Sequence, residues 1–204
     1  DADRCVMVDE KGHILDGDHL MALVALHRLK EEKLNHRTVV ITEMSNTGFV
    51  HFLEKNGIKT LKVPVGDQSI AMALRKGKLS FGGEQSGHIL FPEFTTTVDG
   101  MITALQVLAV MRAEQSTLCA LAHPFEPWPQ VLKNIPVSQK PPLESLPELS
   151  RQIKRCEKEL RGRGRILIRY SGTQDLLRVM IEGEDEKKIQ AMVEELESVV
   201  NSRL

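Results

Sequence analysis

The sequence predicts two domains, an α/β layer domain followed by a smaller α+β domain with an antiparallel sheet. Three observations support this fold class. Apolar runs and amphipathic helices alternate over the first 120 residues. Seven of the nine prolines then fall between Pro124 and Pro147, and this composition break indicates a boundary. Two β-rich runs with a short loop between them follow, and the chain closes on an amphipathic helix.

Capping residues and the spacing of apolar residues predict the elements of the first domain. Asn46 is a helix-capping residue, and Gly57 stands where a helix beginning there should end. Apolar residues recur at three and four residues in the helix after Thr97, and we expect them to form a core stripe: Met101, Ile102, Leu105, Leu108 and Met111. The expected order is strand 5–8, helix 16–32, strand 38–42, helix 46–56, strand 58–63, helix 67–76, strands 79–82 and 89–91, and helix 97–114.

The second domain follows the prolines. We expect a strand over 130–137, a helix over 143–161, strands over 163–170 and 176–182, and a helix over 185–202. The last helix has a clear apolar face, formed by Ile189, Met192, Val193, Leu196 and Val200. The composition break therefore places the boundary between the two domains at about residues 127 and 128.

Composition excludes several classes of function. With 204 residues, 41% apolar and 27% charged, the chain has an ordinary globular balance. A net charge of −1 and 4% aromatic residues predict no nucleic-acid partner. The longest apolar candidate, 101–111, is too short to cross a bilayer, so we expect no membrane association. Three widely spaced cysteines predict free thiols and a cytoplasmic protein.

The stretch GGEQSGH, from Gly82 to His88, carries the most chemical information. It places a carboxylate, an amide, a hydroxyl and an imidazole between three glycines, so several polar groups can converge on one small ligand. This layout is typical of a sugar-recognition loop. An ordinary turn, in which glycine supplies a positive φ, has the same composition and stays open as an alternative.

A second loop lies between the two strands of the α+β domain. Ser171, Gly172 and Thr173 supply hydroxyls and backbone amides, while Arg169 and Arg178 supply two guanidiniums. These groups suit a phosphate, which guanidinium binds in a bidentate manner. A hairpin turn with solvated arginines explains the loop equally well at this point.

The amino-terminal residues Asp1, Asp3 and Arg4 form a third polar group. Carboxylates at alternate positions of a tight loop can direct oxygens at one point, which suits Mg²⁺. Exposed aspartates without a metal are the commoner case, so the pattern alone does not establish a metal site.

Together the three segments resemble one family, the α-D-phosphohexomutases. The family's metal, sugar and phosphate loops stand here as DADR at 1–4, GEQSGH at 83–88 and RYSGTQDLLRVMIEG at 169–183. Connecting stretches resemble the branch that acts on glucosamine phosphates: MVDEKGHILDGD at 7–18, MSNTG at 44–48, VGD at 65–67 and TTTVDGMITALQVL at 95–108. Gln85, in the middle of the sugar loop, also favours the aminosugar.

The resemblance implies an enzyme that interconverts glucosamine 6-phosphate and glucosamine 1-phosphate through a phosphoserine and a bisphosphate intermediate. It implies that Asp1 and Asp3 hold Mg²⁺ and that Arg4 neutralises the transferring phosphoryl group. His88 is implied as the general acid/base or a substrate contact. The implied substrate-binding residues are Gly66, Asp67, Glu84, Gln85, Ser86, His88, Arg169, Ser171, Gly172, Thr173 and Arg178. The resemblance also implies that 1–16 is the end of the metal-binding second domain, 17–127 the sugar-binding third domain and 128–204 the phosphate-binding fourth domain. A homodimer is expected of the complete enzyme.

The sequence also departs from the family pattern. No serine has the phosphoserine context, and the first aspartate of the metal loop is missing before Asp1, so we expect the chain alone to be inactive. Gln68 and Gln174 replace a typical arginine and glutamate. Two alternatives remain open, a mutase of glucose or mannose phosphates and a non-catalytic phosphosugar-binding module.

Overall fold

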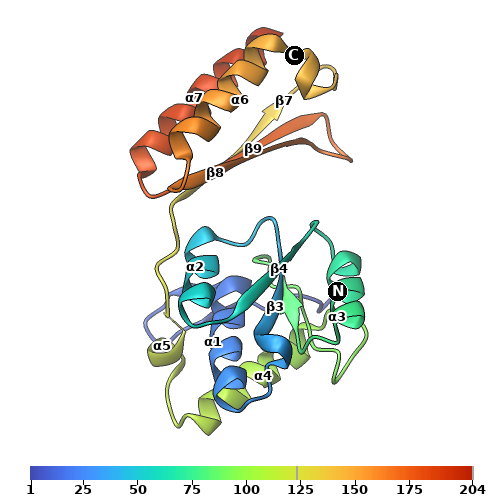
Figure 1. Cartoon of the computed structure of the whole chain (residues 1–204), viewed down its shortest axis with the longest axis vertical. Helices are drawn as coiled ribbons and strands as arrows, with labels where there is room; N and C mark the ends of the chain where they lie inside the picture. Colours follow the sequence, from blue (N-terminus) through green and yellow to red (C-terminus); the bar gives the residue numbers. More distant parts are fainter. Residues whose placement is uncertain (123, 204) are drawn as a thin grey trace. The chain divides into compact units, whose positions relative to one another are not determined.

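The computed structural model describes residues 1–122 and 124–203 and divides into two compact units, Asp1–Pro127 and Trp128–Leu204 (Figure 1). Each unit has its own hydrophobic core. The predicted fold class, an α/β layer domain followed by a smaller antiparallel α+β domain, is confirmed. His123, for which the sequence predicts only a structural role, lies outside the described residues.

The first unit is built around a mixed four-stranded sheet in the order β4-β3-β5-β6. Strand β3 pairs in parallel with β4 and β5, and β5 pairs with β6 in antiparallel fashion. The elements of this unit are β1 (Met7–Val8), β2 (Ile14–Leu15), α1 (Gly17–Lys30), η1 (Asn35–Arg37), β3 (Thr38–Thr42), α2 (Thr47–Lys55), β4 (Lys59–Val63), α3 (Asp67–Gly77), β5 (Gly82–Gly83), β6 (Ile89–Leu90), α4 (Gly100–Ala113) and α5 (Leu118–Leu121).

Helices cover both faces of this sheet, so the three middle residues of β3, Val39 to Ile41, are apolar and fully buried. Val39 and Ile41 of β3 pack into the core that contains α1, α2 and α4. Val40, which points the other way, packs with Ile70 and Leu74 of α3. Burial on both faces is what a parallel strand between two helical layers requires.

Side-chain caps fix where three of the helices begin. Asp16 caps α1 and Asp99 caps α4, each accepting a hydrogen bond from a backbone N–H of the first turn. Asn46 caps α2 by accepting from the Gly48 N–H at 2.8 Å, as the sequence predicts.

The expected core stripe of α4 is wrong at three of its five positions, whereas Ile102 and Met111 do pack against the core. Met101, Leu105 and Leu108 are more than half exposed, whereas Thr103 and Val107 are fully buried. The helix carries apolar residues on most of its circumference, so a spacing of three and four residues fits more than one face. Packing against α1 therefore decides which face is buried, and the spacing does not.

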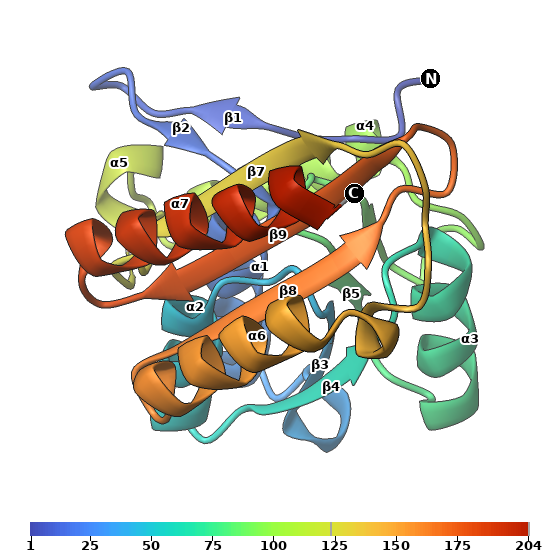
Figure 2. The same cartoon turned by 90° about the horizontal axis from the view of Figure 1, so that it is seen from above.

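The second unit is a three-stranded antiparallel sheet, in the order β7-β9-β8, with α6 and α7 side by side on one face (Figure 2). Its elements are β7 (Gln130–Pro136), η2 (Leu143–Ser145), α6 (Pro147–Leu160), β8 (Gly164–Tyr170), β9 (Leu176–Gly183) and α7 (Glu186–Arg203). The predicted apolar face of the last helix is confirmed, because all five residues are buried in this core.

The sequence also makes predictions about the cysteines and about membrane-spanning helices. The three cysteines, Cys5, Cys119 and Cys156, are free thiols, as the sequence predicts. No helix among the described residues is both long and apolar enough to cross a membrane.

Candidate functional site

A cavity of about 420 Å³ opens where three parallel strands end. Met44 follows β3, Val65 follows β4, and the segment 84–86 follows β5; these residues and Asp16 line the cavity. Crevices at the carboxyl ends of parallel strands are the usual ligand sites of open α/β sheets. The sugar loop predicted from the sequence therefore lies where this topology favours binding.

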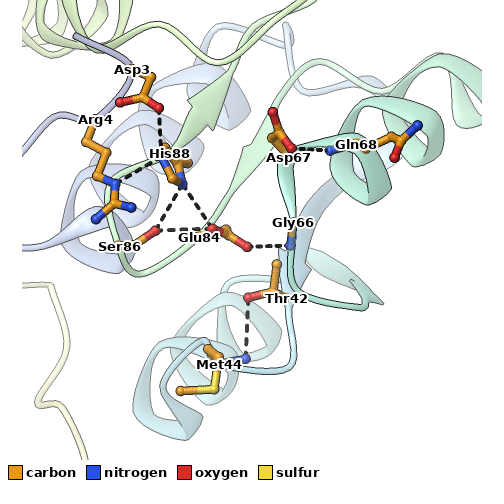
Figure 3. Close-up of polar contacts among 10 residues, drawn as sticks. All are labelled: Asp3, Arg4, Thr42, Met44, Gly66, Asp67, Gln68, Glu84, Ser86 and His88. Carbon is orange, nitrogen blue, oxygen red and sulfur yellow. Dashed lines mark hydrogen bonds and ion pairs between the residues drawn. The ribbon is translucent and has the colours of Figure 1, made fainter. Parts of the chain in front are cut away.

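Glu84 makes the most side-chain contacts in this loop and is only 7% exposed. Its Oε1 accepts a hydrogen bond from the Gly66 N–H at 2.8 Å, which ties the start of α3 to the sugar loop (Figure 3). Its Oε2 accepts from the Ser86 hydroxyl at 3.1 Å and lies 3.2 Å from His88 Nδ1. Three of the residues singled out in the sequence thus contact one carboxylate.

The imidazole of His88 joins this loop to the amino-terminal segment. Its Nε2 lies 3.2 Å from Asp3 Oδ2 and 3.0 Å from Arg4 Nε (Figure 3). One nitrogen cannot donate to Asp3 and accept from Arg4 at the same time, so the two contacts select different protonation states of the ring. A proton on Nδ1 satisfies Glu84 and lets Nε2 accept from Arg4. A doubly protonated ring satisfies Glu84 and Asp3.

Backbone contacts hold the amino-terminal segment against the loop. Arg4 and His88 form an antiparallel bridge, and the Cys5 N–H donates to the Gly87 carbonyl at 3.0 Å. Gly87 has a φ of +94°, and a Cβ there would lie 2.4 Å from the Cys5 carbonyl oxygen. Glycine is therefore required for the approach that places Arg4 beside His88.

Asp1 and Asp3 offer carboxylate oxygens, which are the ligands that Mg²⁺ prefers. Both residues are accessible, and Asp3 already faces His88. Burial acts to raise the pKa of Asp3, but hydrogen bonds from its own N–H and from His88, together with the His88 charge, bring that pKa below its ordinary value. Asp3 is therefore ionised and suited to a cation. Residues 1–122 and 124–203 contain no cluster of three metal-binding side chains.

Asp16 is a cavity residue that sequence reasoning missed. Its Oδ1 accepts from the backbone N–H of His19 at 3.2 Å and lies 2.6 Å from His19 Nδ1. The amide of Gln85 is a further donor to the same carboxylate. In the sequence Asp16 reads only as the start of a helix, although it stands in the stretch at 7–18 that carries part of the resemblance.

Gly66 and Asp67, the two predicted substrate-binding residues of the VGD segment, differ in their contacts. The Gly66 N–H binds Glu84, and Gly66 has a φ of +127° that favours glycine. Asp67 begins α3 and is exposed, and its Oδ1 accepts from the Gln68 N–H at 2.8 Å. Of these two residues, Gly66 makes the hydrogen bond to the sugar loop, whereas Asp67 bonds within its own helix start.

In the second unit, the predicted phosphate loop joins β8 to β9. Arg169 and Arg178 lie opposite each other in the strand register. Ser171 is 4% exposed, and its hydroxyl accepts from the Gln174 N–H at 3.3 Å and from Arg178 Nη2 at 3.5 Å. The structure therefore brings Ser171 and both arginines to one end of the hairpin.

The rest of this loop faces outward. Gly172 and Thr173 are exposed, and a Cβ at Gly172 would meet no atom within 4 Å. Space beside the loop is thus open to a ligand.

Lys140 is a second residue that sequence reasoning missed. Its Nζ donates to the carbonyls of Ser171 at 3.2 Å and Gln174 at 2.9 Å, and it pairs with the Asp175 carboxylate at 3.1 Å. Lys140 stands in the proline-rich stretch, 31 residues before Ser171, and no motif marks it.

Comparisons with known proteins identify the family of this chain. The family model described as phosphoglucomutase/phosphomannomutase, alpha/beta/alpha domain III, matches residues 16–127, and the model of the C-terminal domain matches residues 132–199. Phosphoglucosamine mutases of Geobacter metallireducens and Caldanaerobacter subterraneus are each 46% identical over this whole chain. The chain covers 45% and 46% of those two proteins, so it spans about half the length of the curated relatives it matches.

Solved structures show the same fold at lower identity. Aspergillus fumigatus N-acetylphosphoglucosamine mutase, in complex with GlcNAc-6P and magnesium, has a TM-score of 0.79 and 21% identity. That match covers 98% of this chain and 50% of the fungal one. An N-acetylglucosamine-phosphate mutase in its product complex, a member of the alpha-D-phosphohexomutase superfamily, has a TM-score of 0.76 and 20% identity, over 98% of this chain and 47% of that one. Because two domain models of one family match this chain in order, the chain belongs to the phosphoglucomutase/phosphomannomutase family.

Proposed function

We propose that the chain carries the sugar-binding and phosphate-binding parts of an enzyme that interconverts glucosamine 6-phosphate and glucosamine 1-phosphate. The reaction passes through a phosphoserine, supplied by a part of the protein outside this chain, and a bisphosphate intermediate. The observation that carries the proposal is the group of Glu84, Ser86 and His88 beside a cavity at the strand ends. The names of the 43–46% identical relatives support the aminosugar.

In this proposal Glu84 and Ser86 bind the sugar hydroxyls. Glu84 is held by the Gly66 N–H and by Ser86, so its carboxylate is oriented before the sugar arrives. A buried, oriented acceptor discriminates between hydroxyl patterns more strongly than an exposed one, because a mismatched sugar leaves it unpaired. Gly66, Asp67 and Gln85 complete the sugar-binding set.

His88 is the proposed proton carrier. With its proton on Nδ1, shared with Glu84, the ring offers the Nε2 lone pair to the hydroxyl that attacks the phosphoryl group. Once Nε2 has taken the proton, the imidazolium lies between two carboxylates, Glu84 and Asp3, which stabilise its charge. Arg4 Nε donates to this same nitrogen in the structure. In the proposed reaction Arg4 releases Nε2 and pairs with the transferring phosphoryl group, so that the lone pair becomes available to the hydroxyl.

Asp1 and Asp3 are the proposed ligands for Mg²⁺. The ion, when bound, neutralises charge on the transferring phosphoryl group. Two carboxylates are a usual protein contribution to a Mg²⁺ site, since substrate and water fill the other positions. The magnesium complex of the fungal relative supports this assignment.

The phosphate group that is not transferred is assigned to the loop of the second unit. Arg169 and Arg178 supply the charge, Ser171 and Thr173 supply hydroxyls, and Gly172 lets the backbone approach closely. The opposed pair of arginines at the loop supports this assignment.

Steady-state kinetics of the full gene product with glucosamine, glucose and mannose phosphates test the proposal. We expect kcat/KM to be highest for glucosamine 6-phosphate. A preference for glucose or mannose phosphate assigns the protein to phosphoglucomutase or phosphomannomutase activity instead. Binding without turnover of any of the three makes it a non-catalytic phosphosugar-binding module.

A further inference from the structure

The cavity at the strand ends contains a second carboxylate besides Glu84. We propose that Asp16 binds the protonated amino group of the aminosugar and so determines the preference for a hexosamine phosphate over a hexose phosphate. The inference rests on the proposed function and names the residue that sets its specificity. It concerns only the first unit.

The carboxylate of Asp16 is held in a defined orientation. Asp16 caps α1, and both of its contacts with His19, to the backbone N–H and to Nδ1, use Oδ1. The His19 ring is 12% exposed and stacks on Phe125 with 4.9 Å between the ring centroids. The Asp16 side chain itself remains 32% exposed. A fixed carboxylate is thus presented at the cavity wall.

This carboxylate has acceptor capacity left for a ligand. A carboxylate has about four lone-pair sites, and Asp16 receives two donors from His19 and one from the Gln85 amide. Glu84 also has three polar partners, Gly66, Ser86 and His88, but its side chain is only 9% exposed, against 32% for the side chain of Asp16. Asp16 is therefore the carboxylate of this cavity that is better placed to take a new donor.

The charge of the cavity favours a cation. Within 1–122 and 124–203, two of the six residues that line it are carboxylates and none is a lysine or an arginine: Asp16, Met44, Val65, Glu84, Gln85 and Ser86. Burial acts to raise the pKa of Asp16, but hydrogen bonds and charge from His19, with the Gln85 hydrogen bond, bring that pKa below its ordinary value. The group is therefore ionised at neutral pH. An ammonium bound to a carboxylate makes a charge-assisted hydrogen bond, about twice as strong as a neutral one.

The test compares two ligands that differ at a single position. Glucosamine 6-phosphate and glucose 6-phosphate carry the same phosphate, so their difference in affinity reports only the amino group. Isothermal titration of the 204-residue chain is done with each ligand, for the wild type and for Asp16→Asn. We expect the substitution to weaken glucosamine 6-phosphate binding about tenfold and to change glucose 6-phosphate binding less than about twofold.

The control variants separate charge from folding. Asparagine and serine both cap helices well, so Asp16→Asn and Asp16→Ser keep α1 while they remove the charge. Asp99→Asn is the matched control, because Asp99 caps α4 in the same way and does not line the cavity. It should leave both affinities unchanged.

The outcomes distinguish this inference from the proposed function. If the wild type binds neither ligand, the proposed function is wrong and the role of Asp16 falls with it. If the wild type prefers glucosamine 6-phosphate and Asp16→Asn keeps that preference, only the role of Asp16 is wrong. Equal losses for both ligands reduce Asp16 to a structural residue and overturn the inference, as does a wild type that binds both ligands equally.

Discussion

Arg169 on β8 and Arg178 on β9 are directly opposed in the antiparallel register, so their side chains leave the sheet on the same face. Like charges in this position repel each other and destabilise a hairpin. In addition, Arg178 Nε is buried without a hydrogen-bond partner. The phosphate that we propose for this end of the hairpin would supply the missing negative charge and hydrogen-bond acceptors.

The first prediction is that Arg178→Ala weakens binding of inorganic phosphate at least tenfold at low salt. The wild-type affinity should also fall as salt is added, because the site acts through charge. Phosphate should raise the melting temperature of the wild type but not that of the variant. Arg161→Ala, an exposed arginine at the end of α6, is the control. Equal stabilisation of wild type and Arg178→Ala by phosphate contradicts the assignment.

The second prediction concerns Lys140, which holds two carbonyls of the phosphate loop. Lys140→Met should loosen the loop and weaken phosphate binding about threefold to tenfold, because two hydrogen bonds are lost. Lys140→Arg should restore part of the affinity. Faster amide hydrogen exchange over 171–175 in the methionine variant would show that the effect acts through the loop. Unchanged exchange with weakened binding would mean that Lys140 contacts the ligand directly.

The sequence predicts most of the fold because local signals mark the helix ends. Asn46 and Gly57 are examples, since a cap and a terminating glycine act on their own neighbours in the chain. The four-residue α5 has a threonine cap, Thr117, but it is too short to show a helical period. α5 depends on Glu10, which accepts from the Leu118 N–H at 3.0 Å and from the Cys119 N–H at 2.8 Å across more than 100 residues.

The same distinction applies to the candidate site. Glu84, Ser86 and His88 stand within five residues of one another, so a sequence pattern can reveal them. Asp16 and Lys140 reach their loops only through folding, and their nearest sequence neighbours carry no related chemistry. Propensity and spacing could not identify either residue.

The third prediction tests the face of α4. Leu105→Ala should change the free energy of unfolding by less than about 0.5 kcal/mol, because Leu105 is 61% exposed. Val107→Ala, on the buried face, should lower it by about 2 kcal/mol. Chemical denaturation of the two variants measures both values. A larger loss for Leu105→Ala would restore the core stripe that the spacing predicts.

The fourth prediction is that Glu84 stabilises the first unit as well as binding sugar. Glu84→Ala leaves donors from Gly66, Ser86 and His88 without their acceptor, which should cost about 1–3 kcal/mol of unfolding free energy. Glu84→Gln keeps one oxygen and should cost less. Glu54→Ala, on the exposed surface of α2, is the control for loss of a carboxylate. If Glu84→Ala is as stable as the control, the hydrogen-bond network does not contribute to folding.

The fifth prediction is a dependence of stability on pH through Asp16. Its pKa is lowered in the folded state, so the ionised form stabilises the fold. This contribution is fully present above the unfolded pKa of an aspartate, about 3.9, and is lost as the pH falls through the lower, folded pKa. The difference in unfolding free energy between wild type and Asp16→Asn should therefore be constant near neutral pH and shrink below about pH 4. Denaturation of both proteins across this range measures the difference, and Asp99→Asn shows how much of any change belongs to a helix cap in general. A difference that stays the same into acid would mean that the charge of Asp16 adds nothing to its contacts with His19, and that its hydrogen bonds alone hold the cavity wall in place.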